Sequence, residues 1–267
     1  MNIKAGIALI KLSFQEISAY RLYFIFQIIS SFFYTAIIFF LWKAIYAASG
    51  DAMINGTTFN ETFVQLGLAG TLINIINTYC EWIMSDQMRS GDISISFTRP
   101  VSYRTVIMSK GLGDIITNFL IMFVPGFIVV WLLTGQTIHL GANLVLFLAS
   151  FALASYINLL ISFMTGIIAF YTESVWGIIT MKEAVVTLLS GAVIPLAFFP
   201  DTLRTIVSFL PFQAIFNIPL QILTNSSYTA ADYSRSFIIQ IIWLIILFVL
   251  SELFYRHASK SVVINGG

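Results

Sequence analysis

Long, uninterrupted apolar runs constrain the fold of this chain more than any other feature of its sequence. An apolar helix of about 20 residues crosses the hydrocarbon core of a bilayer, which is about 30 Å thick. Only helices and closed barrels satisfy their backbone hydrogen bonds there. The runs are continuous rather than alternating strands of about ten residues, so we expect an all-α fold and not a barrel. Six transmembrane helices are predicted, at about 22–46, 62–80, 108–134, 142–170, 177–199 and 236–255.

The composition supports a membrane protein with one domain over residues 1–267. Only 9% of the residues are charged, against roughly 25% in soluble domains, and the mean hydropathy is +0.92. The net charge of +1 provides no basic face for a nucleic acid. We therefore expect the lipid bilayer, and no nucleic acid, as a partner.

The basic residues predict how the chain is oriented in the membrane. With six spans both termini lie on one side, and nine of the 13 Lys and Arg residues fall on that side. Cytoplasmic segments carry the excess of positive charge, so we predict a multi-pass protein of the cytoplasmic (inner) membrane with both termini in the cytoplasm. The nine are Lys4, Lys11, Arg21, Arg89, Arg99, Arg104, Lys110, Arg256 and Lys260, whereas Lys43, Arg204 and Arg235 fall on the other side.

Two further segments are apolar but too short or too broken to span the membrane. Residues 1–21 place an apolar stripe at helical spacing beside a few cationic residues, which predicts an N-terminal interfacial amphipathic helix rather than a disordered leader. Residues 200–220 belong to an external stretch that is rich in proline. Asp201 can cap a short helix there that Pro211 ends. We expect broken outer-leaflet helices between the fifth and sixth spans; the alternative is a plain extracellular loop.

Residues 81–105, after the second span, concentrate charge in an otherwise apolar chain. The first eight of them contain no helix breaker, Gly91 suits a left-handed C-terminal cap, and Arg89 in the last turn suits the helix dipole. Pro100 disfavours helical geometry at the residue before it. The pattern predicts a short helix, a turn, an extended link and a third span that begins after Ser102. This compact polar segment either docks into a cleft of a partner through its charge pattern or is a solvated connecting loop.

Motifs of catalysis and of metal binding are absent from the sequence. It contains no G-x-x-x-x-G-K-[ST] phosphate loop and no Gly-Lys pair, so ATP hydrolysis needs a separate chain. No H-E-x-x-H or G-x-S-x-G motif occurs. Cys80 is the only cysteine, and His139 and His257 are predicted to lie on opposite faces of the membrane, so we expect no disulfide and no metal site. We therefore expect a chain that is not an enzyme and binds no cofactor itself.

Charged residues within the predicted spans are few. Glu252 and Arg256 are four residues apart and are predicted to form an ion pair along one helix. Lys182 and Glu183 are adjacent, so they point in different directions, toward a dimer interface or toward the membrane surface. The small residues of the patch 67–71 would allow close helix approach at a dimer interface, or would face lipid. No residue is predicted to contact a substrate.

A series of motifs runs along the chain: Glu81, Gln87-Met88-Arg89, Gly91-Asp92-Ile93 and Arg99-Pro100-Val101, then FYTESVWGI (170–178) and LLSGAVIPLAFFP (188–200). Together they resemble the ABC-2-type permease family, the membrane subunits of ATP-binding-cassette exporters. The resemblance covers essentially the whole chain, because the surface helix, six spans, charged segment and broken outer helices occur in the family's order. One departure is the segment 176–185, where Lys182 is the only basic residue although the family often has several.

The resemblance implies a division of labour between chains. A separate cytoplasmic ABC ATPase subunit, in two copies, would bind ATP and Mg, and two permease chains, identical or homologous, would form the pathway. Residues 81–105 would be the coupling segment that contacts the ATPase. The residues implied to carry this coupling are Glu81, Asp86, Gln87, Arg89, Gly91, Asp92, Arg99 and Pro100, with a second cytoplasmic contact at Glu173.

We therefore expect the permease subunit of an ABC exporter, which extrudes an unidentified substrate. The aromatic content of 15% fits an amphipathic cargo, but it fits membrane proteins in general equally well. One alternative is a self-contained secondary transporter or channel, which would need internal repeats or broken spans near the membrane midplane; the sequence shows no convincing repeat. Another alternative is a membrane scaffold that transports nothing.

Overall fold

The computed structural model describes residues 8, 11–12, 15, 21–135, 141–172, 174–225 and 227–260, and the predicted all-α fold is confirmed over them. The elements are α2 (Arg21–Ser49), β1 (Met53–Ile54), β2 (Thr57–Thr58), α3 (Phe59–Ile76), α4 (Cys80–Ser90), α5 (Ile93–Thr98), α6 (Tyr103–Thr134), α7 (Gly141–Ile167), η1 (Ile168–Phe170), α8 (Trp176–Leu189), η2 (Leu196–Phe198), α9 (Asp201–Ser208), η3 (Pro211–Ala214), α10 (Asn217–Thr224) and α11 (Ala230–Ala258). The predicted interfacial helix at 1–21 lies largely outside the described residues, and so does Glu173.

Five helical segments within the described ranges are long and apolar enough to cross a membrane, which makes the chain a multi-pass membrane protein. They are Ile25–Ser49, Phe59–Ser90, Tyr103–Thr134, Asn143–Phe170 and Ala230–Ala258. The fifth predicted span, 177–199, contains instead the 14-residue helix α8, a turn, and the short 3-10 helix η2. At 1.5 Å per residue, α8 is about 21 Å long, which is shorter than the hydrocarbon core of about 30 Å. A sixth complete span is therefore not confirmed.

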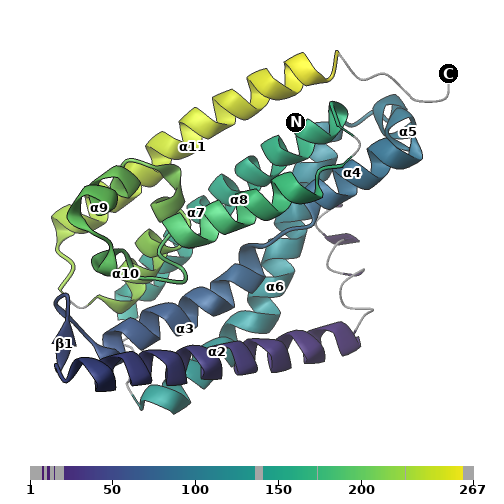
Figure 1. The fold of residues 1–267 in the computed structure, drawn as a ribbon. Coiled ribbons are helices and arrows are strands. Elements are labelled where there is room, and N and C mark those ends of the chain that lie inside the picture. Colours follow the sequence, from purple (N-terminus) through teal and green to yellow (C-terminus); the bar gives the residue numbers. More distant parts are fainter. Residues whose placement is uncertain are drawn as a thin grey trace.

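α2, α3 and α11 run in broadly the same direction, and α6 is inclined to them and crosses α2 in this view (Figure 1). α3 and α7 form the centre of the molecule, because α2 and α6 pack on α3 while α10 and α11 pack on α7. α4 and α5 lie at one end, and the β1–β2 hairpin and α9 lie at the other (Figure 1). The exposed apolar faces of α2 and α11 are suited to lipid or to a second chain.

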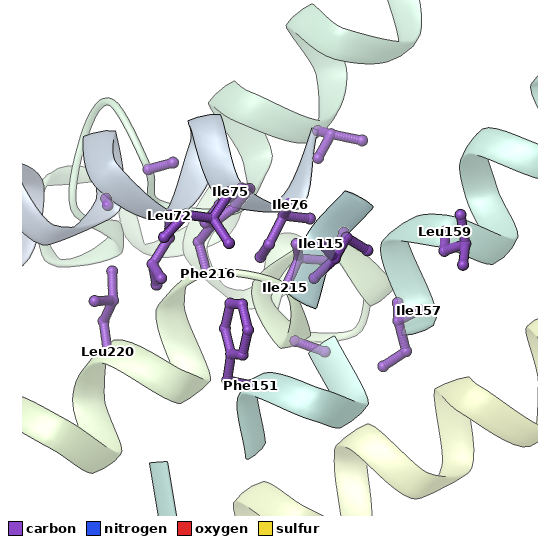
Figure 2. Packing of buried hydrophobic residues seen from close by; sticks show 14 of the residues in the cluster. Leu72, Ile75, Ile76, Ile115, Phe151, Ile157, Leu159, Ile215, Phe216 and Leu220 are labelled. Carbon is purple, nitrogen blue, oxygen red and sulfur yellow. The ribbon is translucent and has the colours of Figure 1, made fainter. Parts of the chain in front are cut away.

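The core lies where α3, α7 and the segment before α10 meet. Leu72, Ile75 and Ile76 of α3 gather near Phe151 of α7 and Phe216 (Figure 2). In the most apolar stretch of the α3–α4 segment, 78% of the residues are buried, against 17% in the corresponding stretches of α2 and α11. α3 is thus a central helix that the rest of the chain surrounds.

Two glycines of α3 permit this close packing. A Cβ atom at Gly67 would lie 2.7 Å from Cγ2 of Val130, and one at Gly70 would lie 2.5 Å from the ring of Tyr34. Both distances are too short for a side chain. The patch 67–71 of α3 is buried against α2 and α6 of the same chain. The prediction that it lies at a dimer interface or faces lipid is therefore wrong.

The charged segment after α3 agrees with the prediction at its two caps. α4 ends with Gly91 in the left-handed conformation, at φ 80°. α6 begins after Ser102, whose hydroxyl oxygen accepts from the backbone N–H of Thr105. Between these caps the predicted extended link is wrong, because Ile93–Thr98 forms the helix α5. Pro100 restricts only the residue before it. That residue, Arg99, ends α5 and has an extended conformation.

The stretch after α8 forms short helices, as predicted. α9 begins at Asp201, whose carboxylate pairs with Arg204 from within the first turn rather than capping the backbone. The helix ends before Pro211, which opens η3. Pro211 is compatible with the first turn of a new helix and ends the previous one because it lacks a backbone N–H.

Candidate functional site

The residues predicted to contact a partner separate into an exposed and a buried group. Asp86, Arg89, Asp92, Arg99 and Pro100 are exposed, Gln87 and Gly91 are partly buried, and Glu81 is fully buried. The exposed residues lie on the second half of α4 and around α5, at one end of the molecule (Figure 1). The structure therefore gathers most of the predicted charges on one surface and places Glu81 apart from them.

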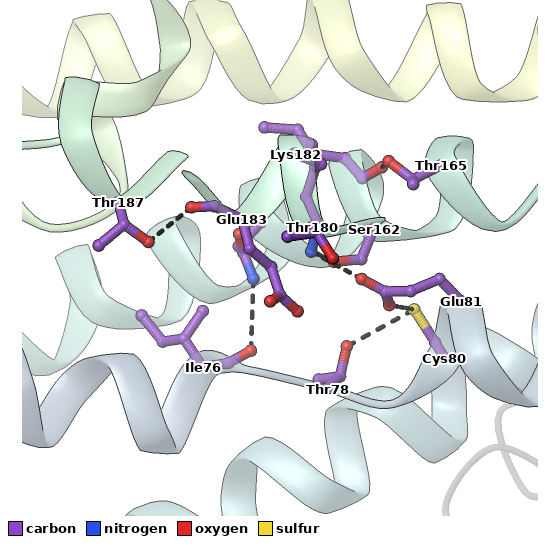
Figure 3. A network of polar contacts seen from close by, with 12 residues as sticks. Ile76, Thr78, Cys80, Glu81, Ser162, Thr165, Thr180, Lys182, Glu183 and Thr187 are labelled. Carbon is purple, nitrogen blue, oxygen red and sulfur yellow. Dashed lines mark hydrogen bonds and ion pairs between the residues drawn. The ribbon is translucent and has the colours of Figure 1, made fainter. Parts of the chain in front are cut away.

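Glu81 is held inside the protein by a cation from another helix. Its Oε1 accepts from Nζ of Lys182 on α8 at 2.6 Å, and its Oε2 accepts from Sγ of Cys80 at 3.2 Å (Figure 3). The same ammonium donates to Oγ of Ser162 on α7 at 3.2 Å. A buried carboxylate is tolerated only when it is paired and hydrogen-bonded. This polar cluster therefore ties the first turn of α4 to both α7 and α8.

A steric contact joins α4 to α7 a turn away from this ion pair. A Cβ atom at Gly166 of α7 would lie 2.6 Å from Sδ of Met84 and 3.2 Å from Cα of Glu81. Because the second atom belongs to the backbone, only glycine permits this approach without a shift of α4. Two independent contacts thus make α4 a rigid neighbour of α7.

α3 and α4 are the two halves of one broken span. Asn77, which follows α3, has the extended conformation φ −66°, ψ 118°. Nδ2 of Asn158 donates to the carbonyl of Ile76 at 3.3 Å, which satisfies one of the carbonyls that a helix end leaves open. Asn158 lies close to the middle of the Asn143–Phe170 span, so the break lies at a similar depth. The polar run Asn77-Thr78-Tyr79 was the sequence signal for it.

An open cleft of about 290 Å³ borders the exposed half of α4. Its lining residues are Trp82, Ser85 and Arg89 from α4, and Ser174, Val175 and Trp176 from the beginning of α8 and the residues before it. The cleft combines one guanidinium with two indole rings. This chemistry fits an acidic or aromatic side chain of a partner protein.

A second ion pair joins two helices at the same end. Arg104 of α6 pairs with Glu252 of α11, donates to Oγ of Ser251 at 2.9 Å, and lies 4.8 Å from the ring centroid of Phe248. Glu252 also accepts from Nε of Arg256 at 2.6 Å, which confirms the ion pair predicted along this helix. The sequence does not identify Arg104 and Lys182 as partners of these carboxylates; its only signal for them is an isolated charge in or beside an apolar run.

The fold and these contacts define a polytopic helical membrane protein with a charged surface at one end and a broken central span. Within the described ranges, no three His, Cys, Asp or Glu side chains are placed to hold a metal. A profile of the family described as ABC-2 family transporter protein matches residues 32–266. The chain belongs to this family, as its motifs predicted. A search of curated proteins finds no match.

Proposed function

We propose that this chain is the permease subunit of an ABC exporter and is driven by a separate cytoplasmic ATPase through α4 and α5. The family supports the permease role, because ABC-2 permeases normally work with an ABC ATPase. The proposed assembly holds two ATPase subunits, which bind ATP and Mg, and two permease chains, identical or homologous. It lies in the cytoplasmic (inner) membrane with both termini and the α4–α5 end in the cytoplasm, and α9 and α10 lie in the outer leaflet.

The observation that carries this proposal is that α4 is exposed at one end and anchored inside the protein at the other. Its second half is exposed and bears Asp86 and Arg89, whereas its first turn is buried and bonded to α7 and α8. An ATPase that moves the exposed half therefore moves two further helices with it. Shifting a two-state equilibrium from 1:99 to 99:1 requires a free-energy difference of about 5.5 kcal/mol, and a rigid connection is needed to deliver it.

The structure supports different roles for the predicted coupling residues. Asp86, Arg89, Asp92 and Arg99 are exposed and form the proposed contact surface, with the cleft beside Arg89 as the place where an acidic side chain of the ATPase binds. Glu81 acts inside the chain as a positioning residue. Three others shape the surface: Gln87 accepts from the hydroxyl of Tyr103 at 2.9 Å, Gly91 ends α4, and Pro100 ends α5. Glu173 remains the proposed second contact.

Affinity purification of the tagged chain in a mild detergent tests the proposal. We expect a stoichiometric ABC ATPase to be recovered with the native chain and to be lost with Arg89→Glu. Lys260→Glu is the matched control, since it reverses an exposed charge near the end of α11 at the same end of the molecule. Recovery of equal ATPase with Arg89→Glu, together with unchanged transport, would show that α4 is not the coupling element.

The broken α3–α4 span favours a second candidate function, a self-contained secondary transporter. Such transporters bind substrates at helix breaks near the membrane midplane, and the break at Asn77 lies at that depth. The family match favours the ABC permease. The same purification separates the two functions, because a secondary transporter would be recovered without an ATPase and would transport without ATP.

A further inference from the structure

A polar cavity of about 100 Å³ lies at the break between α3 and α4. Its lining residues are Ile73, Ile76, Asn77, Asn158, Lys182, Glu183, Val186, Thr187 and Phe216. These come from α3 and the break, from α7 and α8, and from the residue before α10. Since a single water needs about 10–15 Å³, the cavity has room for a group of several heavy atoms.

The charge of the cavity is set by Glu183. Its carboxylate points into the space between α8 and the break, and no hydrogen bond or ion pair joins it to any residue that the structure describes (Figure 3). Lys182 also lines the cavity, but its ammonium is already paired with Glu81. One negative charge is therefore left without a partner, and the carboxyl end of α3 adds negative partial charge beside it. Such a cavity attracts a cation and repels an anion.

Besides the side-chain amide of Asn77, the cavity presents hydrogen-bond acceptors next to the Glu183 carboxylate. The side-chain amide nitrogen of Asn158 donates to the backbone carbonyl of Ile76, and the hydroxyl of Thr187 donates to the backbone carbonyl of Glu183. The amide oxygen of Asn158 and the hydroxyl oxygen of Thr187 thus remain as acceptors beside the Glu183 carboxylate. A primary ammonium has three N–H donors and no acceptor, which matches this set.

The remaining walls are apolar. Ile73, Ile76, Val186 and Phe216 line the other side of the cavity, where an alkyl chain would lose its contact with water. Glu183 is only partly buried, so the cavity is open to a ligand. A bare metal ion fits less well, because the cavity is much larger than one ion and offers a single free carboxylate.

We propose that this cavity binds the primary ammonium group of an amphipathic molecule, with Glu183 as its counter-ion. That the bound molecule is the cargo rests on the proposed transport function, whereas the binding itself does not. The ammonium could belong to a free alkylamine or to the headgroup of an aminophospholipid, and the chemistry of recognition is the same for both.

Binding is tested on the full chain without any ATPase, so that the result does not depend on the coupling proposal. The chain is placed in phosphatidylcholine nanodiscs and titrated with hexylammonium in a calorimeter, with empty nanodiscs as the baseline. Hexyltrimethylammonium carries the same charge without N–H donors, and hexanoate carries the opposite charge. We expect hexylammonium to bind about tenfold or more tightly than hexyltrimethylammonium, and hexanoate not to bind.

The matched variants are Glu183→Gln and Glu61→Gln. Glu183→Gln should weaken hexylammonium binding by about tenfold to a hundredfold, because the ion pair between ammonium and carboxylate is replaced by a hydrogen bond from the ammonium to a neutral amide oxygen. Glu61→Gln should bind as the native chain does, since Glu61 is exposed in the capping box of α3 and glutamine preserves such a box. Equal affinity of Glu183→Gln and the native chain, or of the two ammonium probes, overturns the proposal.

Two further measurements complete the test. In the native chain, hexylammonium should slow the modification of Glu183 by dicyclohexylcarbodiimide, as located by mass spectrometry; unchanged modification at saturating hexylammonium counts against the site even if the variant does not fold. Nanodiscs that contain phosphatidylethanolamine identify the source of the ammonium. Weaker hexylammonium binding there indicates a competing lipid headgroup, and equal binding indicates a free amine.

Discussion

Lys182 and Glu81 form an ion pair with Nζ and Oε1 2.6 Å apart, although 101 residues separate them in the chain. The pair joins the first turn of α4 to α8, and Ser162 extends it to α7. All of the exposed charges on α4 lie beyond this anchored turn. The two residues thus connect a surface that a partner can reach with helices inside the membrane.

Replacement of either partner should destabilise the chain. Lys182→Met leaves the Glu81 carboxylate buried without a cation, which we expect to lower the free energy of unfolding by about 3–5 kcal/mol. Glu81→Gln combined with Lys182→Met removes both charges and should recover most of that loss. Unfolding by SDS titration in detergent measures both variants against the native chain. A double variant as unstable as Lys182→Met would show that the pair itself is not responsible.

The close approach of α4 and α7 gives a second prediction. Gly166→Ala places a methyl group against Met84 and against the backbone of Glu81, so it should reduce stability by about 1–3 kcal/mol and weaken coupled transport. Gly177→Ala is the control, because nothing lies within 4 Å of a Cβ atom there, and alanine is the better helix former. Transport and SDS unfolding are compared for both. Equal effects of the two substitutions would contradict the role of Gly166.

Local sequence signals predicted several features of this fold correctly. Apolar runs identified the long helices because lipid forces them to be helical, and Gly91 and Ser102 marked helix ends because caps depend on neighbouring residues alone. Glu252 and Arg256 were predicted as a pair because helical spacing places residues four apart on one face.

Contacts between distant segments could not be predicted in this way. The ion pair of Glu81 and Lys182 depends on how α4, α7 and α8 pack, and nothing in either local sequence specifies that packing. The length of α8 was also misjudged, because the apolar residues after Leu189 continue the hydropathy of a span although Gly191, at φ 81°, ends the helix. A charge inside an apolar run therefore indicated that an oppositely charged residue lies nearby in the fold, but it did not indicate which residue.

The contact between α6 and α11 gives a third prediction. Arg104→Lys retains the charge but loses the forked geometry that lets one guanidinium reach both Glu252 and Ser251. We expect a loss of about 1–2 kcal/mol in the free energy of unfolding. Arg256→Lys is the comparison, since this exposed pair along one helix should be worth only about 0.3–0.5 kcal/mol. An Arg256→Lys loss as large as that of Arg104→Lys would count against the contact between the helices.

Cysteine labelling tests the proposed orientation, because Cys80 is buried at 2% exposure and should not react in the folded chain. Asp92 and Thr202 are exposed, at the α4–α5 end and on α9 at the opposite end. In intact cells, a membrane-impermeant maleimide should label Thr202→Cys and not Asp92→Cys. After permeabilisation it should label both, and the native chain should react only after denaturation. Labelling of Asp92→Cys in intact cells would place the coupling surface outside, where no cytoplasmic ATPase could bind it.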